Sequence, residues 1–241
     1  MMRSGNPALR GDIFKVADSH AAEGVMTIQG TTNKTLILLV LTFFTAIWAW
    51  GNLSISLPLL LPAAIIGFIV ALVTIFKKER ANITAPIYAL IEGVVLGGIS
   101  AVFEAQYRGI VIQAVSLTFG TLFCLLIAYK SRIIKVTENF KLGVVAATGA
   151  ICVVYIVGFI MSFFGASMPL IHESGPIGIG FSLVVVVIAS LNLVLDFDFI
   201  EKGAEAGAPK YMEWYGAFGL IVTLVWLYLE ILRLLVKISR R

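Results

Sequence analysis

The stretch from Gly175 to Phe197 reads GPIGIGFSLVVVVIASLNLVLDF and holds one ionisable side chain, that of Asp196. About 20 mainly apolar residues suffice for a helix to cross a bilayer. Because lipid contains no water to hydrogen-bond the backbone, a spanning segment must pair its own N–H and C=O groups, so this stretch predicts a membrane-spanning helix. A charged Asp at the centre of such a helix costs about 2.5 to 3.5 kcal/mol. Asp196 is therefore a candidate functional residue.

The rest of the chain has the same character. Of its 241 residues, 59% are hydrophobic and 13% are charged, whereas soluble domains carry roughly 25% charged residues. We predict an all-α, polytopic bundle of seven transmembrane helices in a domain covering residues 35–237. A polar N-terminal extension (1–34) precedes it and a short basic tail (238–241) follows. The other six predicted spans are Thr35 to Gly51, Pro58 to Phe76, Pro86 to Phe103, Gly109 to Tyr129, Lys141 to Phe164 and Tyr215 to Val236.

Basic residues predict the orientation, because Lys and Arg concentrate on the cytosolic side of short loops. Thirteen of the 18 Lys and Arg residues fall on the side of the N-terminus, and Arg108 stands alone on the other side until the C-terminus. We expect a multi-pass protein of the cell membrane with a cytosolic N-terminus. Seven spans place Arg233 and Lys237 on the far side, against this rule. A last segment that re-enters and returns to the cytosol is the alternative.

Other function classes find little support in the sequence. The basic residues are not interleaved with aromatic ones, so we expect contact with lipid headgroups and no binding of nucleic acid. The two histidines, His20 and His172, fall outside the spans, which leaves no Ser–His pair for a membrane protease. An aspartyl protease needs two Asp side chains that face each other, whereas Asp196 and Asp198, two residues apart on one helix, point in different directions. We therefore expect no enzyme and no resident cofactor.

Carboxylates inside the spans carry the functional prediction. Glu92 and Asp196 fall at similar depth near the cytosolic side, and each has a polar residue one turn earlier, Tyr88 and Asn192 respectively. Two carboxylates held close in a poorly solvated site do not ionise together easily, so the pair would respond to protons or bind calcium through oxygen. The alternative is a wet helix end at Asp196 and a hydrogen-bonded, neutral Glu92.

The remaining acids divide into two groups. Glu230 falls in the far half of the last span, where Arg233 three residues later is its simplest partner; a role in an ion pathway is the other reading. Asp198 is a further pathway candidate, although it also belongs to a charge run, with Glu201, Glu205 and Glu213, that solvent can accommodate. In the third span, Gly93 and Gly97 form a small-xxx-small pattern that predicts close helix packing.

Taken together, these features resemble the Bax inhibitor family, in its bacterial branch. The resemblance rests on LDFDFIE at 195–201, LYLEILRLL at 227–235 and EGVVLGGIS at 92–100 followed by Glu104, and it covers roughly residues 35–237. It implies a bundle with the seventh helix at its centre and the other six around it. It also implies a pH-sensitive calcium leak in the bacterial inner membrane, gated by Asp196 and Glu230, with Glu in place of the usual Asp.

Two observations complicate that pairing. On straight helices, the level of Asp196 on the seventh helix falls near Phe218 and not near Glu230, so Glu92 becomes a rival partner. In addition, the second span lacks the Arg that some relatives use as a latch to the sixth-helix Asp, so gating would work through carboxylates alone.

Two functional hypotheses follow. In the first, protons and calcium compete for Asp196 and an acidic partner, and deprotonation opens a pathway around the seventh helix. In the second, the protein conducts nothing, and its N-terminal extension engages a membrane-bound ATP-dependent protease or another membrane complex, as the resemblance also allows.

Overall fold

A computed structural model describes residues 24–165 and 175–240 of the chain. Seven helices in these residues are long and apolar enough to cross a membrane, which confirms the predicted all-α bundle. They are α2 (Ile28–Gly51), α3 (Leu53–Phe76), α4 (Ala81–Gln106), α5 (Ile110–Lys130), α6 (Glu138–Phe163), α8 (Pro176–Glu205) and α9 (Met212–Ser239), with a short 3₁₀ turn, η2 (Lys78–Arg80), before α4.

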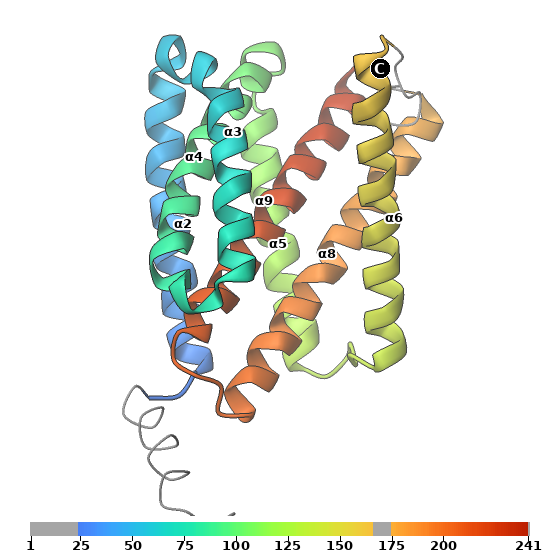
Figure 1. Ribbon diagram of the computed structural model, residues 1–241. Coiled ribbons are helices and arrows are strands. Elements are labelled where there is room, and N and C mark those ends of the chain that lie inside the picture. Colours follow the sequence, from blue (N-terminus) through green and yellow to red (C-terminus); the bar gives the residue numbers. More distant parts are fainter. Residues whose placement is uncertain (1–23, 166–174, 241) are drawn as a thin grey trace, which may run out of the picture.

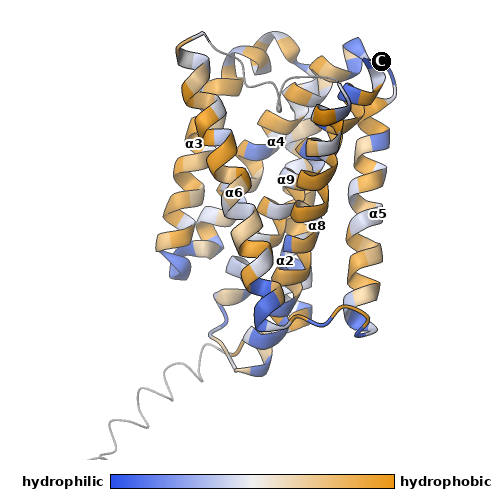
Figure 2. Ribbon diagram, turned by 90° about the vertical axis from the view of Figure 1, so that its right-hand side faces the viewer, coloured by the Kyte–Doolittle hydropathy of each residue, from blue (hydrophilic) through white to orange (hydrophobic). Residues whose placement is uncertain are grey.

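Successive helices alternate in direction, so the bundle has two distinct faces (Figure 1). We call the end where α2 begins the N face and the opposite end, which holds the end of α9, the C face. Hydrophobic residues fill the middle of the helices, and hydrophilic residues gather toward their ends (Figure 2). A re-entrant last segment would have to reverse its direction, whereas α9 runs unbroken from Met212 to Ser239.

Several helices extend beyond the predicted spans. Helix α2 begins at Ile28, inside the segment assigned to the polar extension, and Thr27 caps it by accepting a hydrogen bond from the Gly30 amide (2.9 Å). Helix α8 continues to Glu205 and α9 begins at Met212, so the predicted long loop before the last span is much shorter. The predictions followed the hydrocarbon thickness, while polar helix ends project beyond it.

Helix α9 forms the core of the bundle, as predicted. It is the most buried of the seven spans and packs against α2, α4, α5 and α8. Its residues Leu227, Ile231 and Leu232 are almost completely buried. The ring of six helices implied by the resemblance is incomplete, because α3 packs mainly on α4 and α6 mainly on α8.

Gly93 and Gly97 lie where α4 meets α2. A Cβ atom added to Gly93 would overlap Thr45 and the Thr42 carbonyl, and one added to Gly97 would come within 2.7 Å of the Ala46 Cα. These two backbones therefore approach each other as closely as the small residues allow.

A candidate ion pathway along the last helix

A cavity of about 850 Å³ enters the bundle from the N face between α3, α6, α8 and α9. On α8 its lining runs from Gly203 inward to Asn192, and on α9 from Met212 to Thr223. Each run covers about 15 Å of helix, which is roughly half the thickness of a bilayer's hydrocarbon core. The cavity thus leads from the N face into the membrane-spanning part of the bundle.

Asp196 lies on the wall of this cavity, and one of its oxygens has no partner. Its Oδ2 atom is buried and accepts no hydrogen bond from the described residues. The Thr223 hydroxyl on α9 interacts with the same carboxylate, and a Cβ added to Gly219 would lie 3.8 Å from Oδ1. Straight helices predict that Asp196 lies near the level of Phe218 on the last helix, and the structure puts it beside the next residue, Gly219.

Asp198 belongs to an ion cluster at the mouth of the cavity. Its Oδ2 accepts from Lys202 Nζ at 2.8 Å and lies 3.2 Å from Lys141 Nζ. Asp198 is buried, so the expectation of a merely solvated charge run fails here. The cluster neutralises Asp198 and leaves Asp196, two residues earlier, as the carboxylate of this cavity that has no basic partner.

Glu92 and Tyr88 lie on α4, which packs against α3 and α9. Glu92 faces α3, where a Cβ added to Gly67 would lie 3.4 Å from Oε2. Tyr88 is buried and its ring packs edge-on against Phe218, with 5.1 Å between centroids. Neither Glu92 nor Tyr88 is among the residues that line the Asp196 cavity. The predicted pairing of Glu92 with Asp196 is not formed.

Asn192 joins the Asp196 cavity to a second one. Its side-chain amide donates to the Thr148 hydroxyl on α6 at 2.8 Å. Asn192 lines the first cavity, whereas Thr148 lines a neighbouring cavity of about 410 Å³ between α6 and Trp226 of α9. A single hydrogen bond between two helices thus lies at the inner end of the first cavity. Asn192 was predicted to support Asp196, and the structure directs its amide to α6.

Glu230 is held in a separate network beyond this point. It is 2% exposed and its carboxylate accepts from Arg233 Nη1 at 2.8 and 2.9 Å, from the Tyr155 hydroxyl at 2.8 Å and from Trp226 Nε1 at 3.3 Å. Arg233 also donates to the Tyr155 hydroxyl at 2.7 Å. The partner that the sequence favoured for Glu230, Arg233, is therefore present, and Tyr155 ties the pair to α6.

Asp196 and Glu230 do not meet. Eleven residues separate Gly219, which faces Asp196, from Glu230, a distance of about 16 Å along α9. The pair that the resemblance implies as calcium ligands is therefore not assembled in this structure. The described residues also contain no cluster of three or more His, Cys, Asp or Glu side chains that could hold a metal ion.

A buried lysine follows nearer the C face. Lys237 is 4% exposed, and its Nζ donates to the Ser182 hydroxyl at 2.8 Å and the Gly178 carbonyl at 3.0 Å, both on α8. In the sequence, Lys237 is a basic residue that flanks the predicted last span, which ends at Val236. Its position seven residues after Glu230 places both on one face of α9 and was the available signal.

Tyr155 and Thr148 also belong to this region, and neither was predicted as a site residue. Tyr155 and Thr148 are polar residues in the apolar span of α6, seven residues apart and so on one helix face. That spacing could have indicated a helix turned toward α8 and α9.

Glu213 was assigned to a solvated loop, but it is fully buried in the first turn of α9.

Comparison with known proteins agrees with the features above. The profile of the family described as Bax inhibitor 1 like matches residues 6–240. No curated protein sequence matches the chain significantly. Because the match covers nearly the whole chain, the protein belongs to the Bax inhibitor 1 like family.

Proposed function

We propose that this membrane protein is a pH-sensitive calcium leak, with Asp196 as the proton-sensitive group that controls it. The observation that carries the proposal is the unpaired, buried oxygen of Asp196 on a cavity that reaches the N face. A carboxylate without a basic partner in a poorly solvated place gains much from binding a proton or a cation. Protons and calcium would therefore compete for it.

A leak does not need a complete calcium-binding cage. Conduction requires a site that binds an ion strongly enough to admit it and weakly enough to release it. One carboxylate, assisted by the Thr223 hydroxyl and by water, suits a calcium ion in transit that keeps part of its hydration shell. A cage of several carboxylates would retain the ion instead.

The structure corresponds to a closed form in this proposal. Beyond the Asn192–Thr148 hydrogen bond, the path along α9 meets the Glu230–Arg233–Tyr155 network and then Lys237. The three ionic groups on α9 are Glu230, Arg233 and Lys237. They carry one negative and two positive formal charges, and this net positive charge opposes the entry of calcium. Opening would move α6 relative to α9, because Tyr155 joins the two helices.

The proposal includes the setting of the protein. With basic residues concentrated on the N face, this face would lie in the cytosol and the protein in a bacterial inner membrane. Cytosolic protons would then reach Asp196 through the cavity, and loss of the proton would favour opening. Asp196→Asn mimics the protonated acid and removes its charge.

Calcium flux from proteoliposomes tests the proposal. We expect flux from the wild-type protein that rises from acid to neutral pH, and a flux at least several-fold lower, without this pH dependence, from Asp196→Asn. Glu79→Gln removes an exposed carboxylate from η2 and serves as the control with wild-type behaviour. Absence of flux from the wild-type protein, or an unchanged rate in Asp196→Asn, would contradict the proposal.

A further inference from the structure

The start of α2 is fastened to the turn between α8 and α9, two segments far apart in the sequence. Val25 forms an isolated antiparallel bridge with Pro209, and the Met26 amide donates to the Ala208 carbonyl at 2.7 Å. Because the α8–α9 turn lies at the N face, this contact joins the residues just before α2 to the two helices that carry the proposed pathway.

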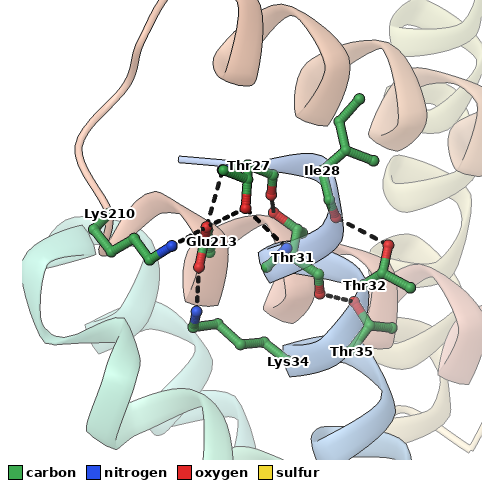
Figure 3. A network of polar contacts seen from close by, with 9 residues as sticks. Thr27, Ile28, Thr31, Thr32, Lys34, Thr35, Lys210 and Glu213 are labelled. Carbon is green, nitrogen blue, oxygen red and sulfur yellow. Dashed lines mark hydrogen bonds and ion pairs between the residues drawn. The ribbon is translucent and has the colours of Figure 1, made fainter. Parts of the chain in front are cut away.

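Glu213 is the centre of this connection (Figure 3). Its side chain is fully buried, and it accepts hydrogen bonds from the Thr27 amide and hydroxyl, both at 2.9 Å, and from Lys210 Nζ at 2.8 Å. Lys34 of α2 forms an ion pair with its other oxygen. A buried carboxylate is stable only when it is paired and hydrogen-bonded, so these donors hold α2 and α9 together at one point.

Gly30 makes this arrangement sterically possible. A Cβ atom at that position would overlap the Glu213 carboxylate, so any larger residue would displace the acid from the first turn of α2. We call the group formed by Val25, Met26, Thr27, Lys34, Lys210 and Glu213 the clasp.

The clasp borders the rim of the Asp196 cavity. Met26 is 2% exposed and fits between two glycines: a Cβ added to Gly203 would lie 3.0 Å from its Sδ, and one added to Gly216 would lie 3.6 Å from its Cε. Gly203, Gly216 and Ala208, which accepts the Met26 hydrogen bond, all line the cavity. Moving Met26 would therefore remove the packing behind the cavity wall at the N face.

We propose that the clasp is a restraint on the cavity rim, through which the N-terminal segment controls access to Asp196. While Glu213 holds Thr27 and Lys34, Met26 supports Gly203 and Gly216 and keeps α8 and α9 together at the rim. Release of the clasp frees the α8–α9 turn and widens the entrance. The proposal rests on the proposed function only in taking access to Asp196 as access for ions. The coupling between the clasp and the cavity rim does not depend on whether the protein conducts calcium.

Access can be measured without measuring flux. Replacing Cys124 and Cys152 by Ala removes the two free thiols of the chain, and Thr223→Cys then places a single thiol deep in the cavity. Its rate of reaction with a membrane-impermeant, cationic thiol reagent reports access from the N face. We expect Glu213→Gln to raise this rate at least several-fold. Glu205→Gln, which alters an exposed acid at the end of α8, should leave it unchanged.

A second pair of variants covers the case in which Glu213→Gln does not fold. Thr27→Val removes one hydroxyl donor and should raise the rate to a smaller extent. Cysteines at positions 25 and 209 should form a disulfide, because partners in an antiparallel pair have Cα atoms about 4.5 to 5.5 Å apart, within the range that a disulfide spans. In Thr27→Val, this disulfide should restore slow labelling of Thr223→Cys. Reduction of the disulfide should make labelling fast again.

The outcomes separate the two proposals. Unchanged labelling of Thr223→Cys in both Glu213→Gln and Thr27→Val, or labelling that ignores the disulfide, would overturn the clasp whatever the flux. Faster labelling in a protein that passes no calcium would support the clasp and contradict the proposed leak. Flux that is controlled by Asp196, together with labelling that does not change when the clasp is altered, would support the proposed leak and contradict the clasp.

Discussion

Two acids on one turn of α8 show how environment decides the role of a side chain. Asp198 is paired with Lys202 and Lys141, and its charge is compensated. Asp196 has a buried oxygen that finds no hydrogen-bond partner in residues 24–165 and 175–240. A buried charge that lacks a counter-ion tends to be neutralised by a proton or a cation. Asp196 can therefore respond to its surroundings, while Asp198 is fixed by its lysines.

Glu230, unlike Asp196, is paired with a basic residue, Arg233. The effect of this pairing on the free energy of unfolding can be measured. Glu230→Gln keeps the shape of the side chain but leaves the Arg233 guanidinium without its carboxylate. Because this acid is buried, we expect the loss of charged hydrogen bonds to cost about 1.5 to 3 kcal/mol. Denaturant unfolding of the protein in detergent measures this change.

Glu138→Gln is the matched control for that experiment. Glu138 also pairs with a basic residue, Lys141, but its side chain is 85% exposed, and exposed pairs contribute about 0 to 1 kcal/mol. Equal stability losses in the two variants would show that the Glu230 network does not hold α9 to α6 as described.

At the residue scale, the sequence indicates the candidate acids and one partner on the same helix, Arg233 for Glu230, but not the partners on other helices. Depth in a span follows from counting residues, so Asp196, Glu92 and Glu230 could be identified from the sequence. Their partners depend on how each helix is rotated and tilted in the bundle, which a single sequence does not specify. Glu213 was missed for a related reason. It lies among charged residues in the sequence, and the fold of the N-terminal segment over it is what buries it.

The helices themselves were predictable, and their ends less so. Hydropathy marks the part of a helix that lies in lipid. It does not mark the polar turns beyond, such as Ile28 to Lys34 of α2, which depend on the Thr27 cap and the contact with Glu213. The polar end of α8 was taken for a loop in the same way.

The α2–α4 contact gives a prediction at the scale of elements. Gly97→Ala would force a methyl group against the Ala46 backbone, so we expect α2 and α4 to separate slightly and the protein to lose stability by about 1 to 3 kcal/mol. Thermal unfolding in detergent measures the loss.

Gly120→Ala serves as the control for this substitution. It is also a glycine in the middle of a membrane helix, but an added Cβ meets nothing within 4 Å. Alanine favours the helix over glycine, so this variant should be neutral or slightly more stable. If Gly97→Ala proves as harmless as Gly120→Ala, the close approach of α2 and α4 is wrong.

The whole molecule is asymmetric across its two halves. The N-face half contains the 850 Å³ cavity and the clasp at its rim, while the C-face half contains the paired Glu230 and the buried Lys237. Under the proposed function, an ion that enters from the N face would reach Asp196 and meet the positive charges of Arg233 and Lys237 beyond it. In the proposed leak, this arrangement is a closed form whose cavity opens at the N face only, which neither span count nor basic flanks could indicate.

The proposed leak requires Asp196 to gain and lose a proton, and infrared spectroscopy of the protein in lipid measures this protonation directly. We predict a band of the protonated carboxyl group that is present at acid pH, disappears toward neutral pH as calcium flux appears, and is missing from Asp196→Asn. A wild-type protein in which this band is absent throughout, or persists unchanged while flux rises, would contradict the role of Asp196 as the proton-sensitive group.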